Sequence, residues 1–215
     1  DGSRLASGGS YNMVRVWDCA EGKVVLRLKG HSENVIDVAW SPDGSMLASG
    51  ARDKTVRVWD SSEGKEISLL KGHEEWVLSV AWSPDGTKIA SGGCGDDGTV
   101  RVWDASNGKD LYVLKGHEGS AWDVAWNPDG TKIASCGLDK TVRVWDADRG
   151  KEQEHEVLKP QAQDCVWSPL SSICPKTARE QEGERGQGAL ILTMHLEELA
   201  QFEGFCAILR RPSDA

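Results

Sequence analysis

Serine, histidine and aspartate residues recur in this chain in an order and at a spacing that could serve nucleophilic catalysis. The three sets are His31, Ser49 and Asp53; His73, Ser91 and Asp97; and His117, Ser135 and Asp139. A serine that is activated by a histidine, which an aspartate orients in turn, is the arrangement of many hydrolases. A nucleophile is expected to be unique and to lie in a cleft, whereas this set occurs three times. The triplication favours a structural role over a catalytic one.

The three sets belong to a longer sequence repeat, which is marked by three short motifs. Trp-Asp pairs begin at residues 17, 59, 103 and 145, so the period is 42 to 44 residues. Gly-His pairs keep step at residues 30, 72 and 116, and Pro-Asp-Gly turns begin at 42, 84 and 128. A period of about 40–45 residues with these signatures is typical of WD40 repeats. The chain therefore resembles the WD40-repeat β-propeller family over about residues 1–169.

Each repeat is expected to form four short strands. In one repeat these lie at residues 35–40, 46–50, 55–59 and 66–70, with a turn at 42–44 in which proline presets φ and glycine accepts a positive φ. Four strands at this period resemble one blade of a β-propeller. We therefore predict an all-β propeller segment of about four blades. Complete blades are expected at residues 32–71, 74–115 and 118–158.

The two ends of the repeat region together supply the strands of one further blade. Residues 1–9 match 43–51, so the N-terminus provides strands two to four, and residues 164–169 match the first strand at 37–42. Either the termini complete a shared blade and close a four-bladed ring, or the chain is an excerpt of a larger propeller. We favour the excerpt, because the family usually closes with more blades. Tyr11 stands at the aspartate position of the N-terminal blade, so the seam is expected to be weak.

Residues 170–215 do not follow the repeat and are predicted to form a separate tail. Residues 176–187 are polar and contain glycine, as in a linker. Leu192, Leu196 and Leu199 lie at helical spacing, and they predict a short helix in this tail.

Composition and charge argue against several classes of partner. The formal net charge is −9, whereas a protein that binds the nucleic-acid backbone needs a basic face. The six cysteines show neither a CxxC pair nor zinc-ligand spacing, and we expect free thiols in a reducing compartment. No secretory signal opens the chain, and three glutamates interrupt its most apolar stretch at 189–209. We expect a cytoplasmic protein with no metal, cofactor, nucleic-acid or membrane partner.

The resemblance implies what the serine, histidine and aspartate sets do. In WD40 proteins these positions and the tryptophan of the Trp-Asp pair form a hydrogen-bonded tetrad inside each blade. The aspartate accepts from the histidine, which contacts the serine, which in turn contacts the indole nitrogen. The tetrads would contain Trp59, Trp103 and Trp145 as their fourth members. Loss of one partner from such a buried network costs roughly 1–3 kcal/mol, so the tetrads would stabilise the fold.

The resemblance also implies a binding surface at the top of the propeller, around its central channel. Positions three and five after each histidine, and the residue before each turn aspartate, tend to line this surface in the family. In this chain they are Asn34, Ile36, Arg52, Trp76, Leu78, Asp96, Ser120, Trp122 and Leu138. Of the ten tryptophans, Trp76 and Trp122 are the two outside repeated core positions. They could anchor a protein-binding hot spot rimmed by Arg52 and Asp96, or merely pack between blades.

The function that we predict is a non-catalytic scaffold of WD40 repeats, which binds proteins or peptides through this top surface. An alternative is a regulatory or interaction domain of a larger enzyme or signalling protein whose catalytic part lies outside this chain. A truncated product without a stable fold is a third interpretation. The unpaired strand edges of an open propeller would also favour self-association.

Overall fold

A computed structural model describes residues 2–152, which form fifteen β-strands in four antiparallel sheets. Sheet 1 contains β1 (Arg4–Ser7), β2 (Met13–Asp18) and β3 (Lys23–Lys29). Sheet 2 contains β4 (Val35–Trp40), β5 (Met46–Ala51), β6 (Thr55–Asp60) and β7 (Glu66–Lys71). Sheet 3 contains β8 (Val77–Trp82), β9 (Lys88–Gly93), β10 (Val100–Asp104) and β11 (Asp110–Leu114). Sheet 4 contains β12 (Ala121–Trp126), β13 (Lys132–Gly137), β14 (Val142–Asp146) and β15 (Lys151–Glu152).

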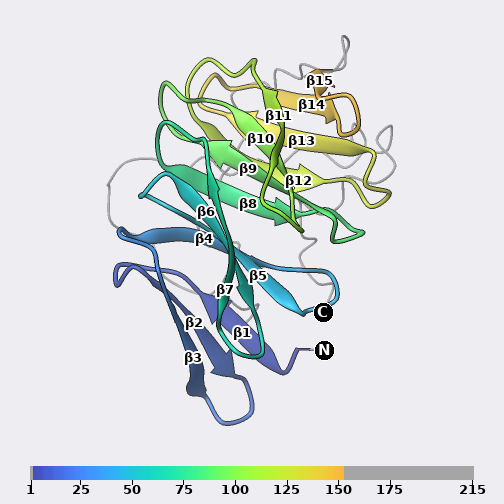
Figure 1. The fold of residues 1–215 in the computed structure, drawn as a ribbon. Coiled ribbons are helices and arrows are strands. Elements are labelled where there is room, and N and C mark those ends of the chain that lie inside the picture. The colour runs from blue at the N-terminus through green and yellow to red at the C-terminus, as the bar shows by residue number, and fades with distance from the viewer. Residues whose placement is uncertain (1, 153–215) are drawn as a thin grey trace, which may run out of the picture.

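The four sheets follow one another in chain order, each a meander of antiparallel neighbours (Figure 1). The first strand β4 of sheet 2 contacts β8, the first strand of sheet 3, and β8 contacts β12, the first strand of sheet 4. Strand β1 of sheet 1 contacts β4. The outer edges of sheets 1, 2 and 3 are β3, β7 and β11. The predicted all-β propeller segment is therefore confirmed within the described residues. The first strand expected at residues 164–169 and the tail at 170–215, with its predicted helix, lie outside them.

The turn between the first two strands of each four-stranded sheet depends on its Pro-Asp-Gly sequence. In sheet 2, the Asp43 carboxylate accepts hydrogen bonds from the hydroxyl of Ser41 at 2.6 Å and the amide of Ser45 at 3.1 Å. Hydrogen bonds from the Ser41 and Ser45 hydroxyls lower the pKa of Asp43 to about 2. Gly44 follows with a φ of 72°, which glycine adopts without steric cost. The turn thus fixes the register of β4 against β5.

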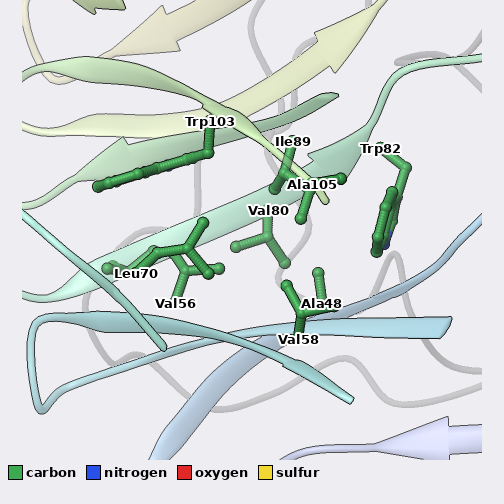
Figure 2. Packing of buried hydrophobic residues seen from close by; sticks show 10 residues of the cluster. Ala48, Val56, Val58, Leu70, Val80, Trp82, Ile89, Trp103 and Ala105 are labelled. Atoms are coloured by element: carbon green, nitrogen blue, oxygen red, sulfur yellow. The ribbon is translucent and has the colours of Figure 1, made fainter. Parts of the chain in front are cut away.

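The core lies between neighbouring sheets rather than within any one of them. Figure 2 shows Val56 and Val58 of sheet 2 facing Val80 and Ile89 of sheet 3, and all four side chains are buried. Removal of this apolar surface from water is the main force that holds one sheet against the next.

Close approach of the sheets requires glycine near the end of the second strand. A Cβ atom on Gly50 would lie 2.7 Å from Cγ1 of Val77, and one on Gly92 would lie 2.6 Å from the carbonyl oxygen of Ala121. Any larger residue at either place would push the next sheet away.

None of the described residues forms a helix long and apolar enough to cross a membrane.

Candidate binding surface

Each four-stranded sheet contains a hydrogen-bonded chain made of the repeated serine, histidine, aspartate and tryptophan side chains. In sheet 2, Nδ1 of His31 lies 2.8 Å from Oδ2 of Asp53, and Nε2 lies 2.8 Å from Oγ of Ser49. The indole Nε1 of Trp59 donates to the same Ser49 oxygen at 2.8 Å. Thr55 also donates to Asp53 at 2.7 Å. The β5–β6 turn and the β3–β4 connection therefore meet through buried polar groups.

The chain of contacts repeats with nearly the same geometry in sheets 3 and 4. In sheet 3 the distances are 2.7 Å for His73 to Asp97, 2.8 Å for His73 to Ser91 and 2.8 Å for Trp103 to Ser91. In sheet 4 they are 3.0 Å for His117 to Asp139, 2.8 Å for His117 to Ser135 and 2.8 Å for Trp145 to Ser135. Sheet 1 keeps only the bond from Trp17 to Ser7, at 2.9 Å, and its Tyr11 is exposed.

A neutral histidine satisfies every donor and acceptor in these chains. In this assignment Nδ1–H donates to the aspartate, the serine hydroxyl donates to Nε2, and the indole N–H donates to the serine oxygen. Burial lowers the pKa of His31, against the raising effect of its hydrogen bond with Asp53. Burial would raise the pKa of Asp97, but hydrogen bonds from His73 and Thr99 outweigh it and hold that pKa well below its usual range. In sheet 2, the lowered pKa of His31 and the lowered pKa of Asp53 both favour a neutral imidazole beside a charged carboxylate.

The serines of these hydrogen-bonded networks are inaccessible to a substrate. Ser49, Ser91 and Ser135 are each 0% exposed, and each hydroxyl already bonds to a histidine and an indole. A serine nucleophile must reach the carbonyl carbon that it attacks. The geometry therefore supports a structural role for these groups and gives them no means of acyl transfer.

The nine residues expected at the top of the propeller, which we call the candidate binding surface, lie at one end of the sheets. At this end, the turn that follows the second strand of each four-stranded sheet forms a backbone hydrogen bond with the connection that leads into the first strand of the same sheet. The amide of Arg52 donates to the carbonyl of Asn34, and the amide of Leu138 donates to that of Ser120. The amide of Cys94, two residues before Asp96, makes the corresponding bond to the carbonyl of Trp76.

Most of the apolar members of the candidate binding surface are accessible to solvent. Leu138 is 57% exposed, Ile36 and Trp76 are 38% exposed, and Trp122 is 37% exposed. Arg52 and Asp96 are also exposed, whereas Asn34 and Leu78 are half-buried. Exposed tryptophan beside charged residues is typical of protein-binding surfaces.

Ser120 differs from its expected place on this surface. Its side chain is only 4% exposed, and its hydroxyl accepts a 2.8 Å hydrogen bond from the amide of Gly95. The β9–β10 turn, which is two residues longer than its counterparts, reaches across to sheet 4 and covers Ser120. Ser120 therefore links two sheets and offers no side chain to a partner.

A row of polar side chains on the first strands was not expected from the sequence. The amide of Val80 donates to Asp37 at 2.9 Å, and the hydroxyl of Ser79 donates to Asp123 at 2.7 Å. Burial raises the pKa of Asp37 to about 6, although the Val80 amide opposes this effect. The signal that could have revealed the row is the polar residue six positions after each repeated histidine.

The potential metal ligands and the thiols of residues 2–152 do not gather into a cluster. No group of three or more histidine, cysteine, aspartate or glutamate side chains is arranged there to hold a metal ion. Cys19, Cys94 and Cys136 are free thiols.

Comparisons with known proteins agree with the repeat pattern. The family model "WD domain, G-beta repeat" matches residues 22–60, 64–104 and 108–146. Ribosome assembly protein 4 of Chaetomium thermophilum is 49% identical over 41 residues, which are 19% of this chain and 8% of that protein. The U5 small nuclear ribonucleoprotein 40 kDa protein of Mus musculus is 40% identical over 43 residues, 20% of this chain and 12% of that protein. The matches thus span only a small part of these relatives, about the length of one repeat.

Proposed function

The chain belongs to the WD40-repeat family, and on that basis we propose that it is a non-catalytic platform that binds other proteins or peptides. Two relatives are named for ribosome assembly and for a small nuclear ribonucleoprotein, which supports a role within an assembly. A fold alone does not define a function, so the proposal needs a surface that can carry it.

The observation that carries the proposal is the exposure of large apolar side chains at one end of the sheets. Ile36, Trp76, Trp122 and Leu138 are all more than a third exposed there, whereas Trp59, Trp103 and Trp145 of the repeats are buried. A fully buried tryptophan removes about 150–250 Å² from water. More than a third of each of the Trp76 and Trp122 side chains is still exposed for a partner to cover, so each can serve as an anchor of an interface. The inaccessible serines further favour binding over catalysis.

Substitutions taken from sister repeats test this proposal with little risk to the fold. Trp76→Asn copies Asn34, and Trp122→Ile copies Ile36. Ile67→Asn is a matched control, because Ile67 is 46% exposed but lies on the outer strand β7. We expect both tryptophan variants to keep their circular dichroism melting curves and to capture much less of the proteins that the wild type retains from lysate, while Ile67→Asn captures the same amount. Unfolding of both tryptophan variants would instead show that the two rings only pack between sheets.

We also propose that the protein works in the cytoplasm, a reducing compartment. The three free thiols among the described residues support this proposal, because disulfides are rare in such compartments. Microscopy of the tagged chain tests it.

A further inference from the structure

On the candidate binding surface, an arginine in a turn of sheet 2 contacts a tryptophan in the connection that leads into sheet 3. The guanidinium carbon of Arg52 lies 4.4 Å from the centroid of the Trp76 ring. Both side chains are exposed. A guanidinium over an indole face is a favourable cation–π arrangement. The stack orders Arg52 and leaves the edge of its guanidinium, where the N–H groups lie, open to a ligand.

The hydrogen-bond donors of this pair are unused. Within residues 2–152, neither the Arg52 guanidinium nor the Trp76 indole nitrogen has a hydrogen-bond or ion-pair partner. Other indole nitrogens find partners nearby: Trp82 donates to the carbonyl of Ala39, and Trp126 to that of Ala81, both at 3.2 Å. The four tryptophans of the Trp-Asp pairs all donate to serine. Two adjacent unpaired donors, one of them cationic, are suited to an anionic acceptor.

A neighbouring lysine holds the two segments of the pair together. Nζ of Lys54 donates to the carbonyl of Glu74 at 2.6 Å and to the Glu75 carboxylate at 3.2 Å. These contacts join the turn that carries Arg52 to the connection that carries Trp76. They also engage the Lys54 ammonium, so that Arg52 is the cation still available at this place. The pair is therefore organised before a ligand arrives, which reduces the entropy cost of binding.

The positions equivalent to Arg52 and Trp76 hold other residues at the other sheet boundaries. Between sheets 1 and 2 the equivalent residues are Ser10 and Asn34, and between sheets 3 and 4 they are Asp96 and the buried Ser120. The repeats are otherwise so alike that residues 80–93 and 124–137 differ at two positions only. Among the described sheet boundaries, these two positions thus hold an arginine and a tryptophan only between sheets 2 and 3, as expected of a specific binding site.

We propose that Arg52 and Trp76 form a receptor for one aspartate or glutamate carboxylate in a peptide segment of a protein partner. This inference rests on the proposed function and names the chemistry of the partner. The carboxylate accepts hydrogen bonds from the guanidinium and the indole N–H, and an adjacent apolar side chain of the peptide packs on the exposed part of Trp76.

Charge near the pair favours a carboxylate over a phosphate. Glu74 and Glu75 directly precede Trp76, Asp96 is exposed on the same surface, and the whole chain has a formal net charge of −9. A phosphate group carries up to two negative charges and would be repelled more strongly by these groups than a single carboxylate. One arginine, with the neighbouring Lys54 ammonium already bound to Glu74 and Glu75, also matches one carboxylate.

The test begins with peptides selected from a random heptapeptide phage library against the full chain. A selected peptide is synthesised with its acidic residue intact, as the amide, and as phosphoserine, and each Kd is measured by calorimetry. The chain is compared with three variants. Arg52→Leu copies Leu138 and removes the charge, Arg52→Lys keeps the charge but not the planar donors, and Lys140→Asn removes one positive charge from the equivalent turn of sheet 4.

We expect selected peptides to share an acidic residue beside an apolar one, and Arg52→Leu to weaken their binding by about tenfold or more. Arg52→Lys should recover part of the loss, and Lys140→Asn should change Kd by less than about twofold. On the wild type, replacing the acidic residue of the peptide by its amide should weaken binding by the same factor as Arg52→Leu does. On Arg52→Leu, the acid and amide peptides should bind with equal affinity. The phosphoserine peptide should bind the wild type more weakly than the acidic peptide does.

Three results would overturn the inference: peptides without a shared acid, an Arg52→Leu variant of unchanged affinity, or phosphoserine that binds more tightly than the carboxylate. If Trp122→Ile abolishes binding in that event, the proposed function stands and only the carboxylate receptor fails. If no peptide is enriched over an unrelated protein, both fail.

Discussion

Nδ1 of His73 lies 2.7 Å from Oδ2 of Asp97, so the connection that enters sheet 3 is joined to the β9–β10 turn through a buried pair. The next residue, Glu74, donates its amide to the same carboxylate oxygen at 2.9 Å. Asp97 therefore organises the end of the sheet at which the candidate binding surface lies.

Replacement of Asp97 by alanine should destabilise the protein without an effect on any chemistry. The change leaves Nδ1 of His73 without its acceptor in a buried place, and we expect the free energy of unfolding to fall by roughly 1–3 kcal/mol. Urea unfolding followed by tryptophan fluorescence measures the change. Asp96→Ala is the matched control, because Asp96 is the exposed neighbour and should alter stability by less than about 0.5 kcal/mol. Equal midpoints for the two variants would refute the structural role of Asp97.

The pKa shifts of these networks predict a loss of stability in acid. The pKa values of Asp53, Asp97 and Asp139 are lowered in the folded state, because hydrogen bonds to each carboxylate outweigh the effect of burial. Their contribution is present above the unfolded value of about 4 and is lost as the pH falls through the folded values. The lowered pKa of His31 acts in the same direction below about pH 6.5. Urea midpoints should therefore fall from pH 7 to pH 3, and the fall should be smaller in Asp97→Ala. The same pH dependence in both proteins would contradict this account.

Asp37 should show the opposite dependence on pH. Its folded pKa is raised to about 6 from 3.8, so its contribution to stability is present below 3.8 and is lost as the pH rises through 6. Asp37→Asn keeps an oxygen that can accept from the Val80 amide but removes the charge that burial and nearby Asp123 disfavour. We expect the variant to gain roughly 1–3 kcal/mol over the wild type at pH 7 and little at pH 4. Thermal melts at both values measure the difference, and an equal effect at the two would exclude the raised pKa.

Close packing between sheets should make Gly50 intolerant of a side chain. A Cβ atom there would lie 2.7 Å from Val77, so Gly50→Ala should cost roughly 1–3 kcal/mol of stability. Gly9→Ala is the control, since a Cβ atom on Gly9 would meet nothing within 4 Å. Differential scanning calorimetry compares the two variants. Similar melting temperatures would mean that sheets 2 and 3 are not in close contact at Gly50.

Sequence motifs predict the strands and the hydrogen-bonded networks well, because both depend on residues at fixed offsets within one repeat. The turn at 42–44 and the strand at Val35–Trp40 follow from local backbone preference. His31, Ser49 and Asp53 belong to a single sheet, so the repeat period alone places them together.

Contacts between sheets are harder to predict, since they depend on how far one repeat reaches into the next. Burial of Ser120 follows from a turn two residues longer in the preceding sheet, and the period does not reveal where that turn points. The stack of Arg52 on Trp76 joins residues of different repeats, each of which varies from one repeat to the next. The hydrogen bond from Val80 to Asp37 is equally hard to predict, because the two residues lie on different sheets.

The central claim, that the exposed end surface binds proteins, is tested most directly by site-specific photocrosslinking. A benzophenone amino acid is placed at Leu138, which is 57% exposed on this surface, or at Ile67, which is 46% exposed on the outer strand β7. After irradiation in lysate, mass spectrometry identifies the crosslinked proteins. The account predicts discrete products from Leu138 that weaken when Trp76→Asn is added, and none of them from Ile67. The same products from both positions, or products from Ile67 alone, would contradict it.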